Sequence, residues 1–229
     1  MVESQSRIAT MKIVDTVLEQ DILEAELERS KPAIPSECQH LHWLLSTPFR
    51  YAPYPHGSRF RRARQREGCL YASRRVETAI AEDAFYRLLF FLDSPTAVRP
   101  SNLHERTAFR LTFDTSAGID LMTPAFQARR AVLSHTTDYG PCQDLADAAR
   151  KGGCQALQYA SVRDPNQGAN LALLCCTAVT SREPLRFQTW HIAIRTDRLE
   201  ALCELPRQRL TFPLAVWAAT DPRIPERLP

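Results

Sequence analysis

Residues 69–92 read CLYASRRVETAIAEDAFYRLLFFL, a strand signal followed directly by a helix signal. The first four residues, Cys69–Ala72, form a short apolar run of the kind found in buried strands. Ser73 can cap the N-terminus of a helix, which we predict from about Arg75 to Leu92. The C-terminal half of that helix is apolar on nearly every side, so we expect it to be buried. Apolar side chains recur along the helix at helical spacing, at Ala79, Ile80, Ala84, Leu88 and Phe91.

The chain beyond this helix changes to a strand pattern, in which apolar residues alternate with polar ones or form short runs. A further helix is predicted over Cys142–Lys151, where Gly152 and Gly153 end it, and a short one over Leu199–Glu204. Helices at the ends of the chain with several strands between them indicate an α+β fold. The predicted strands are Ala108–Asp114, Ile119–Met122, Ala156–Ser161, Ala169–Val179 and Arg186–Ile194.

The first 40 residues differ in composition from the rest of the chain. Residues 1–30 carry seven acids against three basic residues, and apolar residues recur among them at helical spacing. We predict an amphipathic helix from about residue 9 to residue 29, followed by an extended linker that contains two prolines. The sequence therefore predicts an N-terminal helical extension and linker over residues 1–40, which docks on the core or on a partner, and a main domain over residues 41–229.

The overall composition is that of a globular protein. Of the 229 residues, 44% are hydrophobic and 24% are charged, and 29 basic residues against 26 acids give a net charge of +3. No run approaches the roughly 20 apolar residues that cross a bilayer. Acids interrupt the N-terminal segment where a secretory signal would be apolar. We therefore expect a cytoplasmic protein that does not enter the membrane.

Cysteine, glycine and histidine usage exclude several kinds of site. The seven cysteines contain no C-x-x-C pair, so we expect reduced, mostly buried thiols rather than a zinc ribbon or a redox motif. The seven glycines form neither G-x-G-x-x-G nor G-x-x-x-x-G-K-[ST], which excludes the usual Rossmann fingerprint and the P-loop. His40 and His42 supply only two ligands, so we expect no metal site.

Arginines gather in one segment of the chain. Residues 50–75 hold eight arginines, including Arg50 and Arg59, and a single acid, Glu67. Such a segment can bind phosphate through bidentate guanidinium contacts, or it can be a solvated loop. The net charge of the whole chain is small, and no nucleic-acid-binding motif accompanies the cluster. These observations favour a local anion site over a nucleic-acid interface.

Three side chains are candidates for chemistry. Glu82 lies in the alanine-rich stretch TAIAEDA, where a carboxylate is costly to bury unless it is paired. Tyr71 lies eleven residues before it, and a strand-to-helix turn can bring both side chains to one cleft. Ser161 ends a predicted strand, but no G-x-S-x-G motif supports it as a nucleophile. From these residues alone, the simpler interpretation is that Glu82 faces water or pairs with an arginine and that Ser161 forms a turn.

Five pieces of the chain occur in an order that carries a family resemblance. They are Gly57-Ser58-Arg59-Phe60, Leu70-Tyr71-Ala72-Ser73, Thr78-Ala79-Ile80-Ala81-Glu82, Tyr159-Ala160-Ser161-Val162-Arg163 and Gly168-Ala169-Asn170-Leu171. Together they resemble the RES family, which is named for an arginine, a glutamate and a serine. The resemblance spans about residues 46–195.

The chain departs from the family pattern at three points. Phe60 replaces the usual tryptophan, and Ala160 replaces the usual proline. The loop after Arg59 is longer and more basic than in the family, so Arg61 or Arg62 is an alternative to Arg59 as the family arginine.

The resemblance implies a fold and a function. The implied fold is α+β and ADP-ribosyltransferase-like, with a mixed β-sheet core and flanking helices. The implied function is that of a bacterial toxin in a toxin–antitoxin system, which uses NAD⁺ as its substrate and cleaves the nicotinamide–ribose bond. A mono-ADP-ribosyltransferase that modifies a cellular protein is the alternative, and a non-enzymatic phosphate- or nucleic-acid-binding module is the third reading. The implied partner is an Xre-like antitoxin that blocks the active site, and a homodimer is left open.

The same resemblance assigns roles in NAD⁺ cleavage without a metal ion. The carboxylate of Glu82 would stabilise the oxocarbenium-like ribose. Arg59 would bind the pyrophosphate, with Arg50 as a second contact. Tyr71 would stack on the nicotinamide ring, and Ser161 would hydrogen-bond the ribose or the carboxamide. Two neighbours of these residues complete the predicted NAD⁺ contacts, Tyr51 and Arg163.

Overall fold

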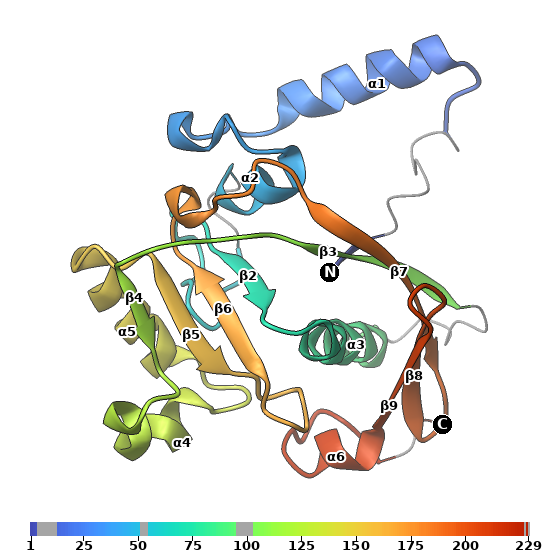
Figure 1. Cartoon of the computed structure of the whole chain (residues 1–229). Coiled ribbons are helices and arrows are strands. Elements are labelled where there is room, and N and C mark those ends of the chain that lie inside the picture. The colour runs from blue at the N-terminus through green and yellow to red at the C-terminus, as the bar shows by residue number, and fades with distance from the viewer. Residues whose placement is uncertain (4–12, 51–54, 95–102, 227, 229) are drawn as a thin grey trace.

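The computed structural model describes residues 1–3, 13–50, 55–94, 103–226 and 228 of the chain. Helix α3 (Val76–Leu92) lies between two β-sheets and contacts both (Figure 1). The first sheet has the order β2-β6-β5-β4, and β4 runs parallel to β5 while the other pairs are antiparallel. Its strands are β2 (Leu70–Ser73), β4 (Gly118–Asp120), β5 (Ala156–Ala160) and β6 (Ala169–Leu173).

The second sheet is antiparallel throughout and has the order β1-β3-β7-β8-β9. Short β1 belongs to the extension predicted from the sequence, yet it pairs with β3 of the main domain. Helices and mixed sheets together make an α+β fold, as the sequence predicted. The strands of this sheet are β1 (Val2–Glu3), β3 (His104–Arg110), β7 (Leu185–Ile194), β8 (Arg198–Cys203) and β9 (Gln208–Pro213).

Except for α1, the remaining helices and turns flank the two sheets (Figure 1). Helix α5 packs on the first sheet through Cys142, Ala146 and Ala149, and α6 packs with α3 on the second sheet. The remaining elements are α1 (Val17–Ser30), α2 (Trp43–Arg50), α4 (Arg130–Leu133), α5 (Gly140–Lys151) and α6 (Leu214–Ala218), with the 3₁₀ turns η2 (Ser36–Cys38), η3 (Pro124–Arg129) and η4 (Cys176–Ala178).

Helix α3 confirms the helix predicted from the opening sequence. Ile80, Ala84, Phe85 and Leu88 are fully buried, because each faces one of the two sheets or α6. The predicted cap is wrong: the N-cap residue is Arg75, with no side-chain cap. Ser73 is instead the last residue of β2, where it pairs with a residue of β6.

The short helix predicted over Leu199–Glu204 is also wrong, since this segment forms strand β8. Leu199, Ala201 and Cys203 are buried, whereas the residues between them are more exposed. This period of two places one face of β8 against α3 and α6. Leucine, glutamate and alanine favour helix locally, but pairing on both sides with β7 and β9 overrides that preference.

Strands β3 and β7 contain a bulge near one end of their ladder. Ala108 pairs with Gln188 and Arg110 pairs with Leu185, so β7 contributes one extra residue over this interval. Within it, Arg186 has a φ of 48°, in the left-handed region that favours glycine. Holding a non-glycine residue there costs on the order of 1 kcal/mol.

Helix α1 begins at Val17, after the N-cap Thr16, which forms a capping box with Glu19. The predicted residues 9–12 lie outside the described residues. Val17 and Leu18 are 68% and 70% exposed, so the predicted docking of this apolar face on the core is wrong. The helix lies beyond α2, away from the sheets (Figure 1). Docking of α1 on a partner stays a prediction.

A disulfide joins Cys38 in η2 to Cys176 in η4, with the two Cα atoms 5.7 Å apart. The prediction that all seven cysteines are reduced is therefore wrong for this pair. Its partners are 138 residues apart, and nothing local in the sequence indicates their contact. By loop-closure entropy, a cross-link of this span stabilises the fold by up to about 5 kcal/mol.

Candidate active site

A cavity of about 810 Å³ lies beside helix α3, strand β2 and the bulged ends of β3 and β7. Three residues that the sequence predicted for the site, Arg59, Tyr71 and Glu82, line this cavity. The fourth, Ser161, is buried and hydrogen-bonds Glu82 from outside the cavity wall. The structure therefore places Ser161, which follows Glu82 by 79 residues, beside a cavity lined by the other three.

Glu82 projects from α3, and one of its two carboxylate oxygens is held by the protein. Oε1 accepts hydrogen bonds from Ser161 Oγ at 2.6 Å and from Asn170 Nδ2 at 2.8 Å. Within the described residues, no donor is recorded for Oε2. The carboxylate is thus fixed through one oxygen, and the other can serve a molecule in the cavity. The interpretation that Glu82 only faces water or pairs with an arginine does not describe this arrangement.

Ser161 starts the loop between β5 and β6, and its hydroxyl is fully engaged. Its Oγ accepts the backbone N–H groups of Arg163 at 3.1 Å and Asp164 at 2.9 Å. Because these donors occupy the lone pairs of the oxygen, the hydroxyl proton goes to Glu82. Ser161 therefore orients the carboxylate and is poorly placed to act as a nucleophile.

Asn170 on β6 is a site residue to which the sequence reasoning gave no role. Its side-chain Oδ1 accepts a hydrogen bond from Ser73 Oγ at 2.6 Å, which fixes the amide so that Nδ2 faces Glu82. Asn170 is 2% exposed and pairs with Ser73 across the sheet. The only sequence signal was its place in the segment Gly168–Leu171, because strand register cannot be derived from one sequence.

Tyr71 lines the cavity and supports the loop that carries Arg59. Its hydroxyl accepts the backbone N–H of Phe60 at 2.9 Å and lies 2.8 Å from Ser58 Oγ. Burial raises the pKa of the Tyr71 hydroxyl well above its ordinary value, so it stays protonated. Its ring remains available on the cavity side, and the predicted stacking on nicotinamide stays a prediction.

Arg59 also lines the cavity, but its guanidinium group is largely committed to the protein. Nη1 donates to the carbonyl of Leu133 at 2.9 Å, and Nη2 donates to the carbonyl of His135 at 3.0 Å. The group lies 4.7 Å from the ring centre of Tyr139 and is 7% exposed. These contacts make Arg59 a link between the cavity wall and the loop after α4, and a pyrophosphate contact for it stays a prediction.

The other predicted NAD⁺ contacts lie elsewhere or cannot be placed. Arg50 donates from Nε to the carbonyl of Pro32 at 2.7 Å and pairs with Glu28 at 2.6 Å, which ties α2 to α1. Tyr51 lies outside the described residues. Arg50 and Arg163 are not among the described residues that line the cavity.

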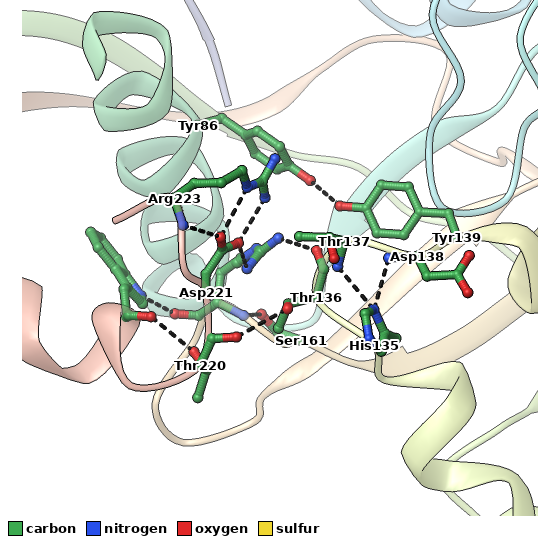
Figure 2. A network of polar contacts seen from close by, with 12 residues as sticks. Tyr86, His135, Thr136, Thr137, Asp138, Tyr139, Ser161, Thr220, Asp221 and Arg223 are labelled. Atoms are coloured by element: carbon green, nitrogen blue, oxygen red, sulfur yellow. Dashed lines mark hydrogen bonds and ion pairs between the residues drawn. The ribbon is translucent and has the colours of Figure 1, made fainter. Parts of the chain in front are cut away.

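Arg163 contacts Ser161, Asp221 and Thr136, and these three partners lie together in the network that Figure 2 shows. Its guanidinium pairs with Asp221 at 2.9 Å, donates to the carbonyl of Thr136 at 2.6 Å and stacks on Phe85 of α3. Its own carbonyl accepts Trp217 Nε1 at 2.7 Å. Arg163 and Asp221 are 1% and 0% exposed, so this arginine joins the C-terminal segment to the site instead of facing a ligand.

This network favours the ionised form of the Asp221 carboxyl over its protonated form. Burial alone would raise the pKa of its carboxyl, but hydrogen bonds from Arg223 and the charge of Arg163 outweigh burial and lower it to about 2. Figure 2 also shows the loop that the network positions, where Tyr139 reaches Tyr86 with the two hydroxyls 3.1 Å apart. Tyr86 lines the cavity beside Glu82.

The arginine cluster predicted over residues 50–75 does not form one continuous phosphate-binding wall. Arg62 pairs with Asp144 and Asp147 of α5, and Arg75 pairs with Glu77. Arg61 and Arg62, the alternatives to Arg59, are absent from the cavity wall as far as the described residues show.

The described residues form neither a metal-binding cluster nor a membrane-spanning helix. They contain no group of three or more His, Cys, Asp or Glu side chains placed to hold a metal ion. Among the helices that these residues form, none has the length and apolar character to cross a membrane.

The model of the RES domain matches residues 34–195 of the chain, which is more than half of its length. No curated protein matches the chain. The RES domain is ADP-ribosyltransferase-like in fold and is generally linked to NAD⁺-acting enzymes and to toxin–antitoxin modules. The chain belongs to the RES domain family.

Proposed function

We propose that this protein is a bacterial toxin that consumes NAD⁺ by cleaving the bond between nicotinamide and ribose. The observation that carries the proposal is the carboxylate of Glu82, which lines the cavity and is fixed through Oε1, while no donor to Oε2 is recorded among the described residues. Cleavage of this bond releases neutral nicotinamide and leaves a ribose with oxocarbenium character. A fixed carboxylate stabilises that positive charge as it develops, without a reorganisation cost at the moment of reaction.

The surrounding residues support this reaction in the proposal. Ser161 and Asn170 hold Glu82 in one orientation, so that its carboxylate is already positioned before the substrate binds. The exposed side of the Tyr71 ring offers an aromatic surface for the nicotinamide. NAD⁺ is a substrate in this scheme, no metal ion takes part, and water or phosphate accepts the ADP-ribosyl group.

A second candidate is a mono-ADP-ribosyltransferase that modifies a cellular protein. The exposed apolar residues of α1 favour it, because Val17, Leu18 and Ile22 offer a surface for a protein substrate. The same cavity can receive a segment of an Xre-like antitoxin, which would block access to Glu82. The proposal also places the protein in the bacterial cytoplasm, because NAD⁺ is found there.

The test is incubation of the protein with NAD⁺ labelled in its adenosine part, with and without cell lysate. Free nicotinamide and labelled ADP-ribose without lysate support hydrolysis, and a labelled ADP-ribose phosphate that needs added phosphate supports phosphorolysis. Transfer of label to a lysate protein supports the transferase. No loss of NAD⁺ under either condition would contradict both enzymatic functions and leave a binding module.

A further inference from the structure

The wall of the cavity is rich in arginine. In the part of the chain that the structure describes, five arginines and two acids line it. Of the two acids, Asp83 is neutralised by Arg106 and Glu82 is the proposed reacting carboxylate. The arginines are Arg59, Arg74, Arg75, Arg110 and Arg186.

Three of these arginines already have partners in the protein. Arg59 is bound to two backbone carbonyls, and Arg75 pairs with Glu77. Arg74 donates from Nε to Gln158 at 2.9 Å and lies over the ring of Phe113. These contacts fix their guanidinium groups and limit what they can offer to a ligand.

Arg110 and Arg186 differ from the other three. For neither side chain does the described part of the chain provide a recorded hydrogen bond or ion pair. Both side chains are exposed and both line the cavity. They lie close together on neighbouring strands, because Arg110 pairs with Leu185, the residue before Arg186. Two guanidinium groups with no carboxylate partner recorded in the described part of the chain suit a phosphate group.

The backbone at this point supports a role in binding. Arg186 lies in the extra stretch of the β7 bulge and has a φ of 48°. Bulges redirect side chains and are frequent beside active sites, and an unfavourable backbone conformation at a non-glycine residue points to a function at that position. Here the bulge accompanies an arginine that lines the cavity.

We propose that Arg110 and Arg186 form a phosphate subsite of this cavity, separate from Glu82, that binds a phosphate group of a nicotinamide dinucleotide. This subsite rests on the proposed function, because it assumes that the dinucleotide occupies the cavity. It reassigns phosphate recognition from Arg59, whose donors are largely occupied, to two arginines for which no partner is recorded among the described residues. The bound phosphate is either the bridging diphosphate or a phosphate on the adenosine ribose, as in NADP⁺.

The variants Arg110→Gln and Arg186→Gln test the subsite, with Arg207→Gln as the matched control. Arg207 is an exposed arginine outside the cavity wall, so its loss changes the net charge equally. Each subsite variant should raise the KM for the dinucleotide about tenfold, while kcat stays within about twofold. An effect on both NAD⁺ and NADP⁺ identifies the diphosphate, and an effect on NADP⁺ alone identifies the ribose phosphate. KM values equal to those of Arg207→Gln for both dinucleotides would overturn the subsite.

Binding of inorganic diphosphate to the intact protein, measured by calorimetry, separates this proposal from the proposed function. If the parent protein binds diphosphate about tenfold more tightly than Arg110→Gln and Arg186→Gln but does not consume NAD⁺, the subsite stands and the proposed function fails. If NAD⁺ is consumed and diphosphate binds equally well to the parent and both variants, the subsite fails.

The variant Arg186→Gly separates a loss of phosphate binding from a loss of the fold. Glycine adopts a positive φ freely, so this variant should keep or raise the melting temperature while it loses affinity for diphosphate. Affinity equal to that of the parent protein would contradict the subsite.

Discussion

Ser161 shows how single atoms determine the chemistry of this site. Two backbone N–H groups donate to its oxygen, and its own proton therefore goes to Oε1 of Glu82. Asn170 donates to the same oxygen, and its amide is fixed by Ser73. The carboxylate is thus oriented by two neutral donors, and no positive side chain is recorded as its partner within the described residues. Its negative charge remains available for a cationic reaction intermediate.

Asn170→Asp tests this arrangement at the scale of one residue. The change places a second carboxylate about where an amide now donates to Glu82 at 2.8 Å. The variant loses one of the two hydrogen bonds that orient Glu82 and places an acceptor against an acceptor. The kcat/KM for NAD⁺ should therefore fall at least about tenfold.

Asn166→Asp is the matched control for that experiment. Asn166 is exposed in the same loop, where its backbone rather than its side chain is bonded to Asp164. Its kcat/KM should equal that of the parent protein. An unchanged kcat/KM in Asn170→Asp would show that the hydrogen bond from Asn170 is not needed to orient Glu82.

At the scale of elements, the loop between β5 and β6 fixes the distance between Ser161 and α3. Gly168 accepts the backbone N–H of Ser161 at 2.9 Å, and Asp164 accepts the hydroxyl of Thr78 on α3 at 2.7 Å. A Cβ atom at Gly168 would overlap the Thr78 hydroxyl and lie 2.7 Å from the Asp164 carboxylate. Absence of a side chain at Gly168 therefore allows the loop to contact the helix that carries Glu82.

Gly168→Ala should weaken both stability and activity. The added methyl group forces Thr78 and Asp164 apart, and overpacking of this kind costs about 1–3 kcal/mol. The free energy of unfolding in urea should fall by that amount, and kcat for NAD⁺ should fall with it. Gly118→Ala is the control, because its Cβ would meet the nearest atom at an ordinary 3.6 Å. Equal stability of the two variants would contradict the close contact.

The elements that the sequence predicted correctly are those with a local signal. Helix α3 follows from the spacing of its apolar residues, and α5 from its start near Cys142 and its end at Gly152. Strand β8 was missed because its residues favour helix and only its neighbours in the sheet make it a strand. In the site, Glu82 and Ser161 followed from the family resemblance, whereas Asn170 depends on its register with Ser73. Long-range pairing is also the reason why the Cys38–Cys176 disulfide was missed.

For the molecule as a whole, the C-terminal segment joins the second sheet to the site. Asp221 pairs with Arg163 behind Ser161, and Trp217 of α6 hydrogen-bonds the carbonyl of Arg163. Residues 196–229 lie beyond the part matched by the RES domain, yet their contacts hold the serine loop in place. The boundary predicted between an extension over residues 1–40 and a main domain over residues 41–229 stays a prediction.

Acid unfolding tests the contribution of Asp221 to the stability of the whole molecule. Its pKa in the folded state is lowered to about 2, below the ordinary value of 3.8, so its stabilisation is complete above about pH 4. That stabilisation, about 2 kcal/mol, is lost as the pH falls from about 4 to about 2. Asp221→Asn should therefore be less stable at pH 7, and its free energy of unfolding should fall less steeply between pH 4 and pH 2. Urea unfolding over this range measures both effects.

Asp197→Asn serves as the control for the acid series, since Asp197 is half-exposed and pairs with its neighbour Arg198. Its pH dependence should equal that of the parent protein. An Asp221→Asn variant with the same slope as the parent would show that the buried pair does not stabilise the fold through its charge.

If the fixed carboxylate of Glu82 stabilises the positive charge that develops on the ribose, the rate of nicotinamide release must depend on it, and Glu82→Gln measures that dependence. Glutamine keeps the size of the side chain and removes its charge, so the initial rate should fall at least about 100-fold. Glu77→Gln on the same helix, whose carboxylate pairs with Arg75, should keep the parent rate. We expect rapid release by the parent and by Glu77→Gln and almost none by Glu82→Gln. Release by Glu82→Gln at the parent rate would contradict this role of the carboxylate.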